Sequence, residues 1–149
     1  MKRAWPQLRL LLLGAVPLLP GCALEKWGRF IAGDRSLAGV LVGVGVLVFF
    51  YVAAQRAARR GEKGFRPLAL LNGFGLLMLV LVCVQLVGAG DYWPNLAGDL
   101  SRWFFLPVMG ISSNLLMRGA SYGWMAPMAA WFLQALLSAI GSNVRFLRK

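Results

Sequence analysis

The chain has 149 residues, of which 59% are hydrophobic and 14% charged, and a formal net charge of +11. A soluble globule with this composition would have too few polar side chains to cover its apolar surface. The composition therefore predicts a single small helical bundle inside a membrane. The 16 Lys and Arg residues are spread over short segments between apolar runs, which argues against nucleic-acid binding and indicates membrane topology and contact with anionic lipid headgroups.

The missing residue types restrict function further. The chain has no His and only five acidic residues, all outside the long apolar runs: Glu25, Asp34, Glu62, Asp91 and Asp99. A His-ligated haem, a His-containing zinc site and a Ser-His-Asp triad are therefore excluded within this chain. We expect no enzyme activity, no metal, no cofactor and no proton-carrying carboxylate in mid-membrane.

The N-terminal segment, residues 1–22, has the order of a signal peptide. Basic residues precede an apolar run, 10–21, that is short for a membrane span and interrupted by proline. The end of the segment, Leu-Pro-Gly-Cys22, resembles the lipobox of bacterial lipoproteins, with Pro20 where that motif has Ala, Ser or Thr. The resemblance implies lipidation at Cys22; cleavage without lipid and retention as an N-terminal anchor are the alternatives. Residues 23–149 are expected to form one transmembrane domain.

Two charge-free runs, 37–54 and 68–89, predict firm transmembrane helices. Each is long enough to cross a hydrocarbon core of ~30 Å at ~1.5 Å per helical residue. The connector, 55–67, carries five basic residues against one acidic residue, and the positive-inside bias places such a loop in the cytoplasm. We interpret the pair as a membrane hairpin.

Small residues predict how these two helices meet. Gly39 and Gly43 form a GxxxG motif, which lets another helix approach closely. Ala69 and Gly73 offer a matching strip on the second helix. The alternative is that these glycines reflect only the composition of a membrane helix.

Segment 101–117 is ambiguous. Its apolar part is shorter than the ~20 residues of a full span, and it contains Pro107. We predict a broken helix that re-enters the membrane from the outer side, with an interfacial helix on the outer surface as the alternative. Uncharged groups here would line a pathway: Gly110, Ser112, Ser113 and Asn114, with Asn72 from the second span.

A third span is predicted at 120–142, followed by a basic tail. If segment 101–117 does not cross the membrane, eleven of the 16 Lys and Arg residues lie inside and five outside; if it crosses, the split is nine and seven. The first split obeys the positive-inside bias better, so loop 55–67 and the C-terminus are predicted to be cytoplasmic. The signal-like N-terminus and compact loops favour a bacterial inner membrane.

These features predict a non-enzymatic integral membrane protein that works by helix association, as an accessory subunit of a membrane complex or as a homo-oligomer. The alternative is a small oligomeric channel or solute facilitator, including a holin-like pore, lined by the uncharged groups near 110–114. An enzyme would have to use Ser112 or Ser113 as nucleophile without a His or an intramembrane Lys to activate it.

Overall fold

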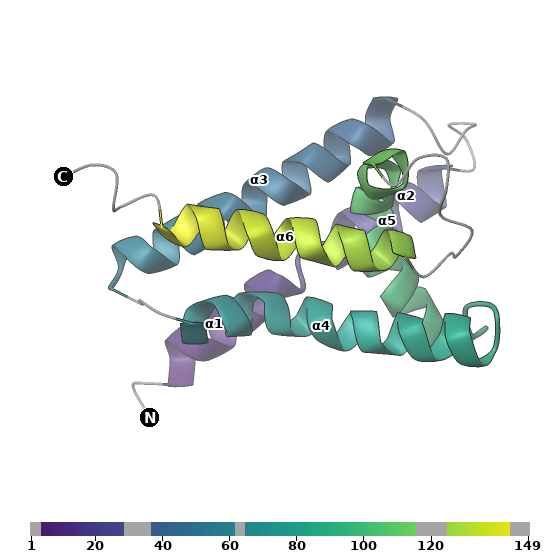
Figure 1. The fold of residues 1–149 in the computed structure, drawn as a ribbon, viewed down its shortest axis with the longest axis horizontal. Coiled ribbons are helices and arrows are strands. Elements are labelled where there is room, and N and C mark those ends of the chain that lie inside the picture. The colour runs from purple at the N-terminus through teal and green to yellow at the C-terminus, as the bar shows by residue number, and fades with distance from the viewer. Residues whose placement is uncertain (1–3, 29–36, 62–64, 116–124, 144–149) are drawn as a thin grey trace.

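The computed structural model describes residues 4–28, 37–61, 65–115 and 125–143. These residues form helices and turns and no strand, which confirms the predicted all-α class. Figure 1 shows the helices in chain order: α1 (Ala4–Gly14), α2 (Leu18–Gly28), α3 (Leu37–Arg59), α4 (Phe65–Gly88), α5 (Leu96–Leu115) and α6 (Met125–Asn143). A helix satisfies its own backbone hydrogen bonds, as lipid requires.

Four helical stretches are long and apolar enough to cross a membrane: Gln7–Trp27, Gly39–Arg59, Phe65–Gly88 and Met125–Asn143. The last three coincide with the spans predicted at 37–54, 68–89 and 120–142, of which 120–124 lie outside the described residues. α3 continues past its predicted end because Ala57 and Ala58 are strong helix formers and both are buried.

The N-terminal apolar stretch is longer than predicted. A turn at residues 15–17 separates α1 from α2, and helix resumes at Leu18. Pro20 falls in the first turn of α2, where a missing N–H removes no helical hydrogen bond. The stretch therefore runs past Cys22 to Trp27 and gives a fourth candidate span, which corrects the expectation that it is too short to cross.

The predicted hairpin has the right direction but the wrong packing. α3 and α6 lie side by side and run in the same direction, and α4 runs in the opposite direction (Figure 1). α1 packs against α4, and α2 packs against α5. α3 and α4 touch only slightly although they follow each other in the chain. These two helices, which follow each other in the sequence, are thus not the two that pack together.

α5 forms the middle of the bundle, where it contacts α2, α3, α4 and α6. Its side chains Phe104, Phe105 and Val108 are fully buried. It is one continuous helix over Leu96–Leu115 that includes Pro107, so the predicted break was wrong for these residues, and 116–117 lie outside the described residues. The re-entrant and the interfacial position of this helix both stay predictions.

The start of α5 was also predicted too late. Asn95 caps the helix, because its Oδ1 accepts the backbone N–H groups of Ala97 at 3.0 Å and Gly98 at 3.1 Å. The helix therefore begins at Leu96, five residues before Ser101.

A neighbouring glycine accommodates Pro107. Because proline has no N–H, the carbonyl of Trp103 one turn earlier lacks its usual helical donor. Gly21 of α2 packs directly on that carbonyl, and any Cβ there would overlap its oxygen. Glycine Cα hydrogens make weak contacts with carbonyl oxygens at such close approach. The backbone of α2 thus covers the group that the proline leaves unpaired.

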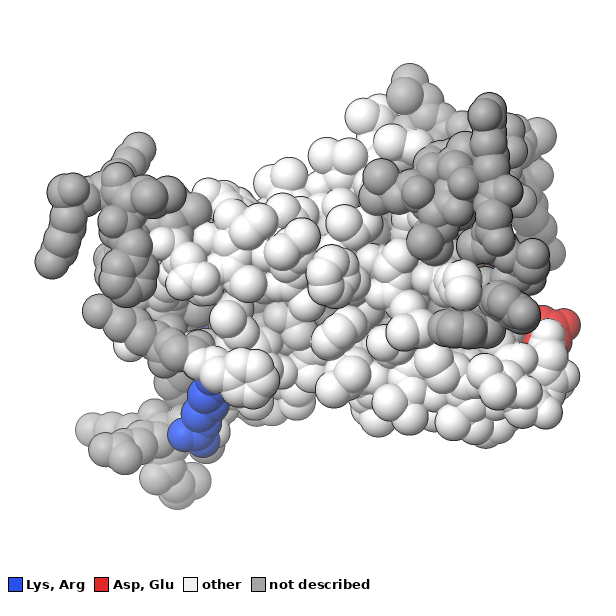
Figure 2. Space-filling model, in the orientation of Figure 1, with Lys and Arg blue, Asp and Glu red and all other residues white. Residues whose placement is uncertain are grey.

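Charge separates the two ends of the bundle. α4 ends and α6 begins at the same end (Figure 1), which we call the acidic end because Glu25, Asp91 and Asp99 lie there. The opposite end, where α3 is followed by α4, is the basic end, with Arg9, Arg56, Arg60 and Arg66. On the face seen in Figure 2, a basic residue marks one end and an acidic residue the other.

Candidate functional site

The described part of the chain includes the side chains of only some of the predicted pathway residues. Ser112 is fully buried in α5, and its hydroxyl donates to the Met109 carbonyl at 3.2 Å. Gly110 lies two residues earlier on the same helix, and the side chains of Ser113 and Asn114 lie outside the described residues. Two cavities of the described bundle are lined by other side chains. A pathway near Ser113 and Asn114 stays a prediction.

Asn72 belongs to a different polar cluster, between α4 and α6. Its Nδ2 donates to the Leu68 carbonyl at 3.0 Å, and its backbone carbonyl accepts the Trp131 indole N–H at 3.4 Å. Its Oδ1 lies 3.5 Å from the Ser138 hydroxyl, which donates more closely to the Gln134 carbonyl at 2.8 Å. Gln134 is 1% exposed, and its Nε2 has no hydrogen-bond partner among the described residues. The sequence analysis missed Gln134 and Ser138, although two polar residues four apart in an apolar run are a visible signal.

A second polar cluster closes the acidic end. Gln85 is fully buried; its Nε2 donates to the Ser101 hydroxyl oxygen at 3.3 Å, and its Oε1 accepts the Trp93 backbone N–H at 3.1 Å. Ser101 in turn donates to the Gly98 carbonyl at 2.9 Å. A single glutamine side chain therefore ties α4 to the following turn and to α5.

An ion pair joins α2 to α5 at the same end. Glu25 Oε1 lies 3.2 Å from Arg102 Nη1, and the second carboxylate oxygen of Glu25 accepts the Trp103 indole N–H. The Arg102 side chain is 49% exposed, so solvent screens the pair and its contribution to stability is small. The hydrogen bond from the Trp103 indole positions the Glu25 carboxylate in this contact.

Tyr92 lies in the turn between α4 and α5 and is half-buried. Burial is the main cause that raises the pKa of its phenol above the ordinary value of 10.0; the charge of Arg102 lowers the pKa and that of Asp91 raises it. The hydroxyl has no hydrogen-bond partner among the described residues. Tyr92 is therefore neutral at physiological pH and carries an unsatisfied polar atom.

Five glycines allow helices of this chain to approach one another. At each of them an added Cβ would press on a neighbouring helix: Gly14 on Leu71, Gly21 on Trp103, Gly43 on Pro107, Gly75 on Phe104 and Trp131, and Gly141 on Tyr51. Helices use such positions to bring their backbones together in membranes. The contacts join α1 to α4, α2 to α5, α3 to α5, α4 to α5 and α6, and α6 to α3.

The predicted strip between α3 and α4 was therefore wrong in its partner. Gly43 is a packing position, but it meets α5. Gly39 is half-buried near the start of α3. Ala69 is exposed, and a Cβ at Gly73 would meet nothing within 4 Å. The GxxxG spacing identified a close-packing face on α3 without identifying the helix that covers it.

Ala69 and Gly73 begin what we call the outward face of α4. Its residues recur at three or four positions, so they lie along one side of the helix: Ala69, Gly73, Leu76, Val80, Val84 and Val87. The last four are 47% to 71% exposed. No helix described in this chain covers this face.

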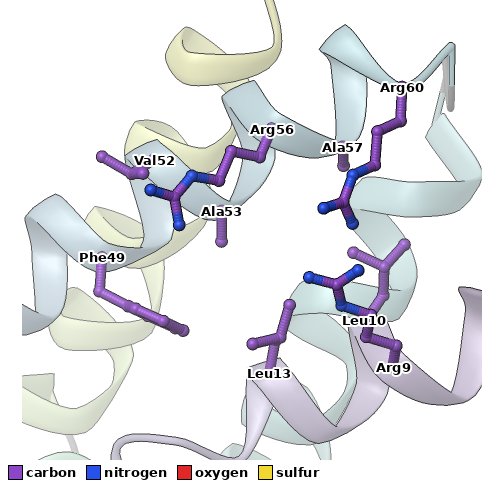
Figure 3. A pocket seen from close by; sticks show the side chains of 9 residues that line it. All are labelled: Arg9, Leu10, Leu13, Phe49, Val52, Ala53, Arg56, Ala57 and Arg60. Atoms are coloured by element: carbon purple, nitrogen blue, oxygen red, sulfur yellow. The ribbon is translucent and has the colours of Figure 1, made fainter.

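Three arginines meet at the basic end in what we call the arginine cleft, a cavity of about 80 Å³ between α1 and the end of α3. Its lining is Arg9, Leu10 and Leu13 from α1, and Phe49, Val52, Ala53, Arg56, Ala57 and Arg60 from α3 and its last turn. Figure 3 shows the guanidinium groups of Arg9 and Arg60 pointing toward each other in this view, and that of Arg56 on the side of Val52 and Phe49. None of the described lining residues is acidic.

Cofactor and metal sites were not expected, and the described residues contain no group of three His, Cys, Asp or Glu side chains that could hold a metal ion. Cys22 in α2 and Cys83 in α4 are free thiols. Comparison with protein-family models, curated proteins and solved structures gives no match to this chain.

Proposed function

We propose that this is a non-enzymatic integral membrane protein that acts by helix association, as an accessory subunit of a membrane complex or as a homo-oligomer. Its four candidate spans support insertion into a membrane. The outward face of α4 supports association, because Ala69 and Gly73 lie four residues apart and no helix described in this chain covers them. Small residues at this spacing let a second helix approach closely.

Exposure alone would not support association, since lipid tails cover apolar side chains as well as another helix does. The small residues add a separate argument. Five glycines of the bundle are already used for contacts within the chain, whereas Gly73 is open. A helix from another molecule would pack closely against α4 at Gly73.

We also propose an orientation in a bacterial inner membrane. The basic end, with Arg9, Arg56, Arg60 and Arg66, would face the cytoplasm, as short loops rich in Lys and Arg do. α5 would stay in the outer half of the membrane, since it joins two helices whose adjoining ends lie at the acidic end. The basic tail predicted to be cytoplasmic lies outside the described residues.

Association is tested with Gly73→Leu in the full chain. Leucine at this position fits the isolated bundle but fills the gap that a second helix would enter. We expect the wild-type protein to purify in mild detergent as an oligomer or with a stoichiometric partner, and the variant to lose that association by about tenfold or more. Light scattering after size-exclusion chromatography measures the mass, and identification of co-purified chains separates the two forms of association.

Gly45→Leu is the matched control. Gly45 on α3 is equally open, but no small residue lies four positions away from it. An equal loss of association in the two variants would contradict the assignment to α4. A monomeric, partner-free wild-type protein would contradict association itself.

A further inference from the structure

We propose that the arginine cleft binds the phosphate of an anionic phospholipid, with Arg9, Arg56 and Arg60 as its ligands. The apolar floor of the cleft would take the first part of an acyl chain. This site is independent of the association proposed for α4, because it lies between α1 and α3 and uses other residues.

Charge supports this site. Three arginine side chains line one small cavity, and like charges gathered there repel one another; no described residue of the lining is acidic. The acids of the described structure, Glu25, Asp91 and Asp99, lie at the acidic end, and Glu62 lies outside the described residues. An anion from outside the chain would remove the repulsion.

The second argument is the type of cation. Guanidinium groups present a planar set of donors that fits the oxygens of phosphate, and they remain charged at every physiological pH. Arg9 and Arg60 approach from two different helices, with Arg56 one turn before Arg60 (Figure 3). A phosphate bound in the cleft would lie between donors from both segments. Basic pockets between membrane helices on the cytoplasmic side bind lipid headgroups in this way.

The third argument is the apolar floor, which distinguishes a lipid from a free ion. Leu13 of α1 and Phe49 and Val52 of α3 also line the cleft, with Leu13 and Phe49 on the side away from Arg60. Phe49 precedes Arg60 by 11 residues, roughly 16 Å along a helix. The cleft therefore changes from basic to apolar along the direction in which a phospholipid changes from headgroup to acyl chain.

The cleft depends on the N-terminal segment. Arg9 belongs to α1, which is held against α4 by the close contact of Gly14 with the Leu71 carbonyl. A chain cleaved near Cys22 would lose α1 and one side of the cleft. The proposal therefore requires that residues 1–22 be retained, and the intact mass of the purified protein checks this directly.

Thermal unfolding of the full chain in neutral detergent tests the proposal, with phosphatidylglycerol, phosphatidylcholine of the same acyl chains, or inorganic phosphate added. We expect phosphatidylglycerol at about ten times its Kd to raise Tm by roughly 4 °C, and the other two to have little effect. An equal rise with phosphatidylcholine would overturn the preference for an anion. An equal rise with inorganic phosphate would overturn the assignment to a lipid.

Arginine variants test whether the rise in Tm depends on the arginine cleft. The double variant Arg56→Gln/Arg60→Gln should lose the rise in Tm, and Arg66→Gln should keep it, because Arg66 lies at the same end of the bundle but outside the cleft. Loss of the rise in Arg66→Gln as well would show general surface attraction and overturn the site. Native mass spectrometry of the wild-type protein needs no variant: preferential retention of one phosphatidylglycerol supports the site, and equal retention of phosphatidylcholine contradicts it.

Discussion

The acidic and basic ends of the bundle differ in how their polar side chains are paired. At the acidic end, two polar side chains find partners within the chain: Gln85 bonds Ser101 and Trp93, and Glu25 bonds Arg102 and Trp103. At the basic end, Arg9, Arg56 and Arg60 line a cavity whose described lining contains no acidic residue. Internal hydrogen bonds fix one end, whereas the charges of the other end are arranged for something outside the chain.

This difference indicates where stability and binding reside. Buried polar groups with complete partners hold neighbouring helices in one arrangement, and removing one partner leaves the other unsatisfied. Exposed like charges do the opposite, since they weaken the fold until an anion arrives. Substitutions that remove a hydrogen-bond partner or a close helix contact at the acidic end should therefore reduce stability, and substitutions in the arginine cleft should mainly change binding.

The largest effect is expected for Gly21→Leu at the acidic end. Any side chain at this position overlaps the Trp103 carbonyl oxygen, and backbone cannot move aside as a flexible side chain can. We expect the free energy of unfolding to fall by about 3 kcal/mol, the upper part of the range for overpacking. Thermal unfolding in detergent measures the loss. Gly45→Leu is the control in an open position, and equal stability of the two variants would mean that α2 does not pack closely on α5.

Gln85→Leu should have the next largest effect. The change replaces the amide by an apolar side chain of similar size and leaves the Trp93 N–H without its acceptor and Ser101 without its donor. We expect a loss of about 1 to 3 kcal/mol in the free energy of unfolding. Arg60→Gln at the basic end is the comparison, since removing one of three repelling charges should leave stability unchanged or higher when no anion is present. Equal losses of unfolding free energy in the two variants would contradict the difference proposed between the two ends.

Tyr92→Phe should change the free energy of unfolding least, and this change should depend most clearly on pH. Because burial raises the pKa of the folded phenol, its stabilising neutral form is fully present below the unfolded pKa of ~10 and is lost as the pH rises through the folded pKa. At about pH 8 the variant should match the wild type or exceed it by about 1 kcal/mol, since it lacks the unpaired hydroxyl. Between about pH 8 and about pH 11 the wild type should lose more stability than the variant. Parallel Tm curves over that range would contradict this.

The sequence predicted the candidate spans well because each is an apolar helix, which depends on a local property, the length of an apolar run without charge. It predicted the partners of those spans poorly because a helix face does not identify the helix that covers it. Gly43 was correctly assigned to close packing, yet its partner is Pro107 of α5 rather than α4. The continuity of α5 was missed for the same reason, since the contact between Gly21 and Trp103 that accommodates Pro107 joins residues 82 positions apart.

The candidate sites show the same limit. The basic residues of the 55–67 loop were read as topology signals, and Arg56 and Arg60 did belong to the basic end. Their meeting with Arg9 depends on the packing of α1 across the bundle, which no local pattern shows. Gln134 and Ser138 were visible as polar residues in an apolar run, but Asn72 was the only part of their cluster that the sequence analysis selected.

The order of helix pairing has a consequence for synthesis. α1 packs against α4, α2 against α5 and α3 against α6, and the first three helices make few contacts with one another. Gly14 leaves the ribosome 57 residues before Leu71, its partner on α4, a delay of roughly 3 to 11 s at ~5 to 20 residues per second. If the chain inserts into a bilayer as it is made, its N-terminal half stays as separate helices during that interval, with its glycine faces covered by lipid. The contacts of α3 are complete only when α6, the last of the described helices, packs against it.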